Sequence, residues 1–129
     1  MISETTRRGN IGEDFAAEYL EKNGYTIVKR NFNTKFGEID IIAKKDNIIA
    51  FVEVKSRADD SLFSPREAVT PSKQRKICKA ALLYSMANKF SERPRFDVFE
   101  VIYGKYDLEI KSFEHIINAF GTEAMHGYF

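Results

Sequence analysis

Apolar and polar residues alternate with two different periods along this chain, and the change of period marks the expected elements. From Ile11, apolar residues recur at helical spacing as far as Gly24, which predicts a helix over about residues 10–23 that ends at a glycine. A second helical pattern predicts a longer helix from an N-cap at Ser72 to about Lys89. Two helices are therefore expected.

Five segments have instead the alternation, or the β-branched and aromatic enrichment, of β-strands. The second and third are joined at Asp46 and Asn47, which tolerate the backbone angles of a tight turn, so they form a predicted hairpin. The fourth and fifth are separated by a turn at Gly104 and Lys105. The five segments are residues 25–32, 37–44, 48–56, 95–104 and 106–117.

The order of these elements predicts the fold class. One helix, three strands, a second helix and two strands combine hairpins with a crossover through a helix. An α/β fold follows, with a mixed β-sheet of about five strands flanked by helices. The polar segment 56–71 is expected to be a loop with a short helical piece near residues 66–69. A length of 129 residues suits one domain over residues 1–129, with a frayed tail after about residue 120.

Composition and charge narrow the classes of function. A hydrophobic share of 43% and a charged share of 30% are typical of a globular chain. The net charge is only +1, so nucleic-acid contacts would have to come from local clusters of Lys and Arg. The single Cys78 suits a reducing compartment. No run of about 20 apolar residues and no signal-peptide pattern is found, so the cytoplasm is the expected location and no membrane is expected as a partner.

The predicted hairpin has charged residues on one face. A two-residue turn sets a register that places Asp40 directly opposite Glu53, and Glu38 opposite Lys55. Directly opposed residues have Cβ atoms about 4.5–5.5 Å apart, so two carboxylates there repel each other unless something positive lies between them. Mg²⁺ would be such a group, because it binds a few carboxylate oxygens and keeps several waters. A lysine on the same face could orient a water or stabilise a phosphate oxygen.

A simpler explanation exists for the same residues. Glu38 and Lys55 could form a cross-strand ion pair, while Asp40 and Glu53 lie on a solvated face of the sheet. Short motifs of this kind often match by chance, so the hairpin alone favours the ion-pair explanation. Further residues are needed to support a metal site.

Each predicted helix contributes a charged residue on its apolar side. Glu13 lies on or near the apolar stripe of the first helix, and Lys73 lies on the apolar edge of the second, near its N-terminus. Snorkelling or an ordinary salt bridge accounts for either residue alone. The candidate constellation is Glu13, Asp40, Glu53, Lys55 and Lys73.

Six ordered segments between Gly12 and Val101 carry a family resemblance. They are GEDFAAEYL, GYTIVKRNF, GEIDIIA, FVEVKSR, EAVTPSKQRKI and RFDVFEV. In this order they resemble the YraN-type family of small bacterial proteins, which is similar to the restriction-endonuclease-like superfamily and especially to the archaeal Holliday junction resolvases. The metal-dependent nucleases of that superfamily carry an acid, then an acid, one residue and a lysine on a sheet. The resemblance implies a restriction-endonuclease-like core.

The resemblance also implies roles for individual residues. It makes Asp40 the first metal ligand, Glu53 the second, Lys55 the motif lysine and Glu13 the acid of the first helix, with Ile39 where the motif has proline. All four charged residues would be catalytic. Asp40, Glu53 and Glu13 would hold the metal, which is expected to be Mg²⁺, with Mn²⁺ as a substitute.

The leading hypothesis is a Mg²⁺-dependent nuclease or nuclease-like protein that acts on DNA by metal-assisted hydrolysis. The chain has no room for a separate specificity domain, so branched or otherwise structured DNA is the expected partner. Arg57 and Lys73 are the favoured nucleic-acid-binding residues because they flank the proposed site, whereas a solvated helix face explains Lys76 equally well. His115 and His126 are too isolated in the sequence to suggest a metal ligand or a general base.

Two other classes of function stay open at this point. The first is a catalytically inactive nucleic-acid-binding or assembly module that keeps the fold and its metal site. The second is a structural interaction protein whose acids serve only as ion pairs. A homodimer is implied only by the similarity to the resolvases, which act in pairs.

Overall fold

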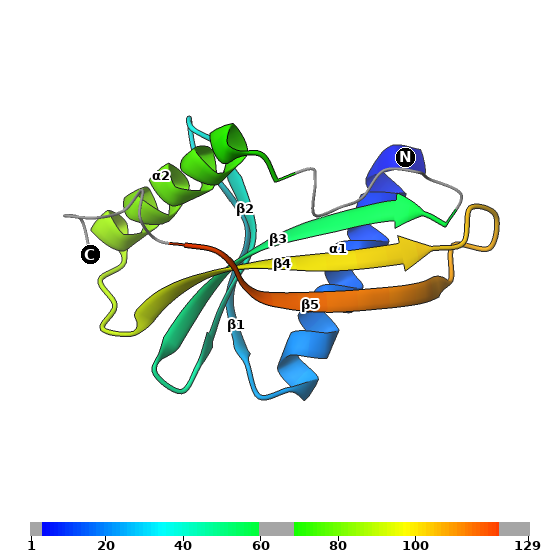
Figure 1. Cartoon of the computed structure of the whole chain (residues 1–129). Helices are drawn as coiled ribbons and strands as arrows, with labels where there is room; N and C mark the ends of the chain where they lie inside the picture. Colours follow the sequence, from blue (N-terminus) through cyan, green and yellow to red (C-terminus); the bar gives the residue numbers. More distant parts are fainter. Residues whose placement is uncertain (1–3, 60–68, 122–129) are drawn as a thin grey trace.

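The computed structural model describes the chain over residues 4–59 and 69–121, and its side chains from residue 11 onward within those ranges. In these ranges it has two helices and one five-stranded sheet, in the order that the sequence predicts (Figure 1). The elements are α1 (Glu4–Lys22), β1 (Thr26–Asn33), β2 (Glu38–Lys45), β3 (Ile48–Ala58), α2 (Pro71–Ala87), β4 (Arg93–Tyr103) and β5 (Ile110–Phe120).

The sheet has the strand order β1-β2-β3-β4-β5 and is mixed. Strands β3 and β4 run parallel, and every other neighbouring pair is antiparallel. Parallel neighbours need a long crossover connection, and α2 lies within the segment that connects these two strands. The predicted α/β class is therefore confirmed, and the architecture is consistent with a restriction-endonuclease-like core.

The two helices cover opposite faces of the sheet (Figure 1). Side chains of a strand point alternately to its two faces, and β3 shows this clearly. Ile49 and Phe51 pack in the cluster that contains α2, whereas Ala50 and Val52 pack in the cluster that contains α1. This alternation places every odd-numbered residue of the middle of β3 on the α2 face, and Glu53 belongs to that series.

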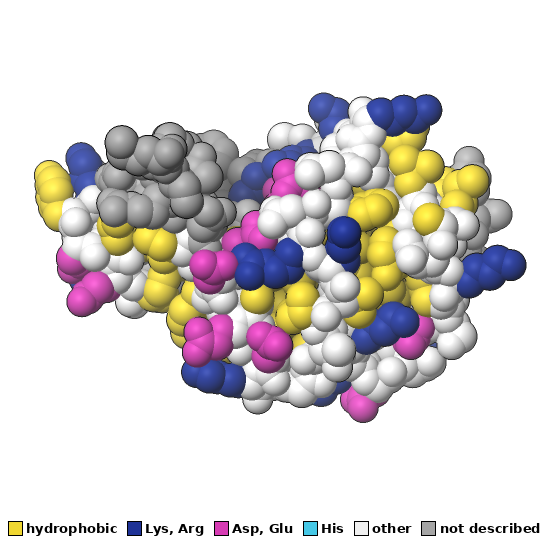
Figure 2. All heavy atoms as spheres, turned by 180° about the vertical axis from the view of Figure 1, so that it is seen from behind, with side chains coloured by type: hydrophobic (Ala, Val, Ile, Leu, Met, Phe, Trp, Pro, Cys, Tyr) yellow, Lys and Arg dark blue, Asp and Glu magenta, His cyan; other side chains and the backbone are white. Residues whose placement is uncertain are grey.

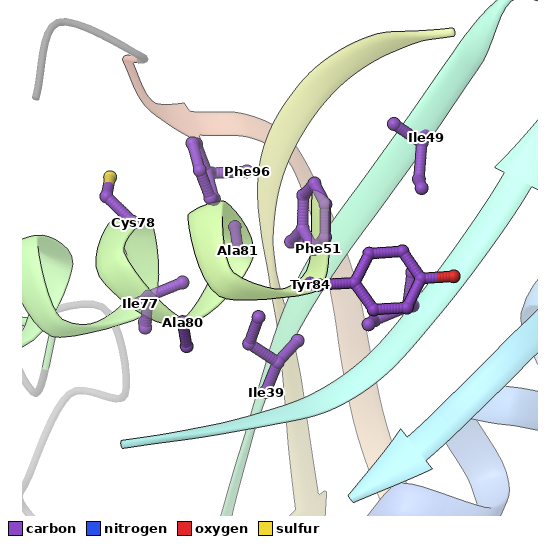
Figure 3. Close-up of a cluster of buried hydrophobic side chains, with 10 residues drawn as sticks. Ile39, Ile49, Phe51, Ile77, Cys78, Ala80, Ala81, Tyr84 and Phe96 are labelled. Atoms are coloured by element: carbon purple, nitrogen blue, oxygen red, sulfur yellow. The ribbon is translucent and has the colours of Figure 1, made fainter. Parts of the chain in front are cut away.

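Aromatic side chains fill the space between α2 and the sheet (Figure 3). The ring of Phe51 lies 5.7 Å from Phe96 of the neighbouring strand and 6.1 Å from Tyr84 of α2, measured between ring centroids. Cys78 is buried in the same cluster. Packing of this kind fixes α2 over the sheet and so fixes the position of its first turn.

Helix α2 begins at a different residue from the predicted one. Its N-cap is Thr70, whose Oγ1 accepts a hydrogen bond of 3.2 Å from the Lys73 N–H, so the prediction of Ser72 was wrong. Proline suits the first helical position because its φ angle is already helical and it has no N–H to satisfy, so Pro71 sets the start immediately after Thr70. The helix ends at Ala87, two residues before the predicted end.

Helix α1 is longer than predicted at its beginning and ends near the predicted residue. It starts at Glu4 rather than near residue 10, because the segment that precedes Ile11 is helical without an apolar stripe to reveal it. It ends at Lys22, and Gly24 has the expected left-handed φ of 91°. The loop helix expected near residues 66–69 and the frayed tail fall mostly outside the described residues. Neither described helix is long and apolar enough to cross a membrane.

Candidate active site

The hairpin of β2 and β3 has the predicted register. Five residue pairs are formed, from Ile41 with Val52 at the far end to Lys45 with Ile48 next to the turn. Asp40 and Glu53 are the next residues outward from this ladder. There the side chain of Asp40 reaches across to β3, where its Oδ2 accepts a 2.7 Å hydrogen bond from the Val54 N–H. The two acids thus share the same end of the hairpin.

Asp40 is held in an environment that disfavours its ionised form. Burial and the negative charge of Glu53 raise its pKa to about 7 from an ordinary 3.8, and the hydrogen bond from Val54 only partly opposes this. The charges of Glu13 and Glu38 add smaller contributions in the same direction. Negative charge is therefore in excess around Asp40, and a cation placed there would be stabilised.

Glu53 is buried, and two lysines bind the same one of its oxygens. Its exposed fraction is 6%, which contradicts the alternative of a solvated sheet face. Lys55 Nζ lies 3.1 Å from Glu53 Oε1, and Lys73 Nζ lies 2.9 Å from the same atom. Lys55 is thus paired with Glu53 of its own strand, whereas the sequence-based alternative paired it with Glu38. Lys73 brings α2 into the site.

The two lysines differ in their pKa. Burial lowers the pKa of Lys55, and the neighbouring ammonium group of Lys73 lowers it further. Burial acts on Lys73 as well, but its contacts with Lys55 and Glu53 outweigh that effect and raise its pKa. Lys55 is therefore the lysine that can give up a proton more easily, and Lys73 is the one that stays charged.

Glu13 is buried as predicted, but residues of β1 already bind its carboxylate. Arg30 Nε and Asn31 Nδ2 each donate a 3.0 Å hydrogen bond to Glu13 Oε1. Arg30 also forms an ion pair of 2.6 Å with Asp14. The charge of Glu13 still contributes to the raised pKa of Asp40, so Glu13 borders the site. Arg30, which the sequence suggests as a phosphate contact, is paired here with Glu13 and Asp14, and Asn31 was not anticipated at the site.

The site has too few protein oxygens to surround a divalent ion completely. It suits an ion that keeps several of its water ligands. Within residues 4–59 and 69–121, no three His, Cys, Asp or Glu side chains form a group that could hold a metal. Asp40 and Glu53 supply two carboxylates, and Mg²⁺ is commonly held by one or two carboxylates with its remaining positions filled by water. The excess negative charge at Asp40 also suits a divalent cation. The residues present therefore fit Mg²⁺ or Mn²⁺ with Asp40 and Glu53 as the protein ligands.

A cleft lies beside these acids, between the beginning of β2 and the first turns of α2. Its volume is about 340 Å³, and Lys73 belongs both to its wall and to the ion pair with Glu53. Arg57 is partly buried two residues beyond Lys55 on β3, so alternation places it on the same face of the sheet. The cleft is lined by Gly37, Glu38, Thr70, Ser72, Lys73, Lys76 and Ile77.

A further buried carboxylate, which the sequence analysis did not single out, lies on the face of the sheet opposite Glu53. Asp97 of β4 is fully buried and accepts two hydrogen bonds from Arg95, of 2.9 and 2.8 Å. His115 Nε2 lies 2.8 Å from Asp97 Oδ2, and the Asn118 N–H donates to Oδ1 at 3.0 Å. The i, i+2 spacing of Arg95 and Asp97 on one strand face was the available signal. His115, isolated in the sequence, has a carboxylate partner in the fold.

Together these features define a small α/β protein with two adjoining carboxylates and two lysines at the junction of its central hairpin with a helix. The family model described as "Uncharacterised protein family UPF0102" matches residues 12–101. The chain belongs to this family, as its YraN-type segments predict.

Relatives in several bacteria resemble the chain over most of its length. A UPF0102 protein of Caldanaerobacter subterraneus subsp. tengcongensis is 46% identical over 113 residues, which cover 87% of this chain and 93% of the relative. One from Clostridium perfringens is 50% identical over 105 residues, or 78% of this chain and 86% of the relative. One from Desulfosudis oleivorans is 46% identical over 121 residues, or 93% of this chain and 94% of the relative.

Proposed function

We propose that this protein is a divalent-metal-dependent nuclease that hydrolyses phosphodiester bonds in DNA. The observation that carries the proposal is the pair of adjoining acids, Asp40 and Glu53, with the pKa of Asp40 raised to about 7 beside a lysine-bound Glu53. Perturbed carboxylates and lysines that converge in one place are characteristic of functional sites. The Glu53-x-Lys55 arrangement on a central strand also agrees with the resemblance to restriction-endonuclease-like nucleases.

Asp40 and Glu53 would hold the ion from two adjacent strands. When bound, Mg²⁺ or Mn²⁺ supplies a Lewis acid that polarises a phosphate oxygen and makes water a better nucleophile. Ionised Asp40 is required for this role, and a nearby divalent charge lowers its pKa again. The hydrogen bond from the Val54 N–H orients the Asp40 carboxylate through Oδ2, and Oδ1 is the oxygen proposed to bind the ion.

Lys55 would act on the phosphate or on the attacking water. Its side chain is held at Glu53, and its pKa is lowered by burial and by Lys73. An ammonium group in this position donates hydrogen bonds to phosphate oxygens, where negative charge develops in the transition state. Because its proton is less tightly bound than that of an ordinary lysine, Lys55 can also accept a hydrogen bond from water in its neutral form.

Glu13 would act as a positioning residue for the site. Its carboxylate is bound by Arg30 and Asn31 of β1, next to the β2 strand that carries Asp40. The negative charge of Glu13 raises the affinity of this region for a cation without direct contact. A role as a further metal ligand would require its bonds to Arg30 and Asn31 to be exchanged.

DNA of branched or otherwise structured form is the proposed substrate, and its contacts would be local. Basic and acidic side chains are interspersed on the face that Figure 2 shows, rather than gathered into one basic surface. The proposed phosphate contacts are Lys73, which lies 2.9 Å from Glu53, Lys76 of the cleft wall and Arg57 of β3. A cytoplasmic location, expected from the single Cys78, would give the protein access to DNA.

A catalytically inactive DNA-binding module is the second candidate. Glu53 is already neutralised by two lysines, and Glu13 by Arg30, so the free protein can hold its acids without a metal. In that case the lysines would bind phosphate but no bond would be cleaved. Binding to DNA without Mg²⁺-dependent hydrolysis would distinguish this function from the nuclease.

The decisive experiment is a cleavage assay on a panel of linear, flapped and four-way-junction DNAs with Mg²⁺, Mn²⁺ or EDTA. The nuclease proposal expects cleavage of at least one DNA that depends on the metal and is lost in Asp40→Ala. Asp107→Asn is the control, because this aspartate lies on the exposed β4–β5 connection and should leave cleavage unchanged. Equal cleavage by wild type and Asp40→Ala would contradict the assigned role of Asp40. DNA binding by wild type without cleavage would favour the inactive module.

A further inference from the structure

Glu53 has an unusual pair of partners for a buried carboxylate. The ammonium groups of Lys55 and Lys73 lie 3.1 and 2.9 Å from the same oxygen, Oε1. Lys55 is anchored two residues away on the same strand, whereas Lys73 reaches Glu53 from α2. One oxygen therefore has more positive charge beside it than a single carboxylate needs.

The side chain of Lys73 has room to change its position, whereas that of Glu53 is enclosed. The side chain of Lys73 is 39% exposed, and that of Glu53 is 7% exposed. A lysine side chain has four rotatable carbon bonds, so its ammonium group can shift by several ångströms while α2 stays in place. Helix packing through Tyr84 and Ile77 holds the backbone of α2 against the sheet. A change of partner at Lys73 therefore needs no change of fold.

The cleft of about 340 Å³ offers Lys73 a second partner. Its wall includes the ammonium-bearing side chains of Lys73 and Lys76 and the hydroxyl-bearing Ser72, and the first turn of α2 contains no acid. Glu38 is the acidic residue of this wall. With Glu53 and its second partner Lys55 included, three lysines face two glutamates here, and this positive balance suits a phosphate group.

This inference rests on the proposed function and deepens it. We infer that Lys73 is a movable counter-ion that holds Glu53 in the metal-free protein and turns to a DNA phosphate in the adjacent cleft when the substrate binds. Glu53 is then left with Lys55 and can accept a divalent ion beside Asp40. Metal and DNA binding consequently strengthen each other, because each favours the position of Lys73 that the other requires.

Electrostatics favours Lys73 at Glu53 when the cleft is empty, and at the phosphate when DNA is bound. Without a phosphate, the ammonium group of Lys73 and a divalent ion compete for the same oxygen of Glu53, and like charges at that distance repel. With a phosphate in the cleft, Lys73 gains an anionic partner and the competition ends. Glu38 opposes the phosphate by its own charge, so its neutralisation in Glu38→Gln should tighten DNA binding.

The test measures Mn²⁺ affinity by electron paramagnetic resonance of the free ion, with and without a four-way DNA junction and with a DNA-only control. Lys73→Met should bind Mn²⁺ about tenfold more tightly than wild type in the absence of DNA, as expected for loss of one competing charged hydrogen bond. DNA should tighten Mn²⁺ binding in wild type but not in Lys73→Met. Lys73→Gln serves as a second variant, and thermal unfolding verifies that both are folded.

Lys76→Met is the matched control, because Lys76 lines the cleft but has no contact with Glu53. It should bind Mn²⁺ like wild type without DNA and should bind DNA more weakly. If wild type binds Mn²⁺ and neither Lys73 variant binds it more tightly, the counter-ion role is wrong while the metal site stands. If no variant binds Mn²⁺ with or without DNA, the proposed function fails as well.

Discussion

Asp40 and Asp97 are two largely buried aspartates of the same sheet, and their surroundings have opposite effects. Burial alone would raise the pKa of Asp97, but hydrogen bonds from His115, from Arg95 and from the Asn118 N–H lower it below its ordinary value. Burial and the charge of Glu53 raise the pKa of Asp40 to about 7, and among the described residues the Val54 N–H donates to it.

The difference separates a carboxylate that is paired within the fold from the one that we propose as a metal ligand. Asp97 has donors for both of its oxygens and joins β4 to β5. Its Oδ2 cannot donate a hydrogen bond while ionised, so the proton of that bond belongs to His115 Nε2. Among the described residues, Asp40 accepts from the Val54 N–H at Oδ2, and the negative charge of Glu53 acts on it. Hydrogen bonds to both oxygens favour the ionised form of Asp97, whereas burial and a neighbouring carboxylate disfavour that of Asp40.

The largest expected effect is the loss of the Asp97 network. Asp97→Ala removes the partner of Arg95 and leaves a partly buried guanidinium uncompensated, which should lower the free energy of unfolding by about 3–5 kcal/mol at pH 7. Because the pKa of Asp97 is lowered in the fold, its stabilisation is present above its unfolded pKa and is lost as the pH falls through its folded pKa. Urea unfolding of the variant measures the change. A loss below about 1 kcal/mol would show that the network is unimportant.

Asp40→Asn should raise the free energy of unfolding, whereas Asp97→Ala lowers it. A folded pKa of about 7 against an unfolded 3.8 means that the folded protein holds this proton more tightly, so stability falls as the pH rises from about 4 to 7. Asparagine removes that penalty and can still accept the Val54 N–H. We expect a gain of about 1–3 kcal/mol at pH 8, below the upper limit of about 4 kcal/mol that the pKa difference implies.

The pH dependence of that gain is its internal control. At pH 5 folded Asp40 still holds its proton while unfolded Asp40 has already lost it, so the gain from Asp40→Asn should be smaller there, about 40% of its value at pH 8. Urea unfolding at pH 5 and pH 8, without added metal, gives both values. A variant that is less stable than wild type at pH 8 would be inconsistent with the raised pKa of Asp40.

The smallest expected effect concerns Glu13. Its charge raises the pKa of Asp40 less than burial and Glu53 do, so Glu13→Gln should lower that pKa by less than the loss of the Glu53 charge would. Gln at this position can still accept hydrogen bonds from Arg30 and Asn31, so the fold should be retained. Carboxyl-carbon NMR titration of Asp40 in the two proteins measures the difference. An unchanged pKa would place Glu13 outside the electrostatic environment of the site.

The strands and helices around Asp40 and Asp97 could be predicted from local sequence, but several of the side-chain contacts could not. The turn at Asp46 and Asn47 predicts the register of the five pairs from Lys45–Ile48 to Ile41–Val52, and Asp40 and Glu53 lie one position beyond the last of them. Apolar periodicity placed Glu13 and Lys73 on the inner sides of their helices. The two strands that hold the Asp97 network were also recognised.

What the sequence could not give were contacts between elements far apart in the chain. Arg30 approaches Glu13 only because β1 lies beside α1, and a positive φ of 54° at Asn31 disturbs the simple alternation of that strand. His115 meets Asp97 through the pairing of β5 with β4, whose register contains irregularities. The shared oxygen of Glu53 depends on how α2 packs, which hydrophobic spacing does not specify to within a hydrogen-bond length.

The most direct test of the central claim is a carboxyl-carbon NMR titration of Asp40 and Asp97 in one sample, without and with Mg²⁺. We expect Asp40 to titrate near pH 7 in the metal-free protein and several-fold excess Mg²⁺ to lower its pKa markedly, because the ion stabilises the carboxylate. The low pKa of Asp97 should be unaffected by the ion. An Asp40 that titrates near 4 and does not respond to Mg²⁺ would contradict the assignment of this pair of acids as a metal site.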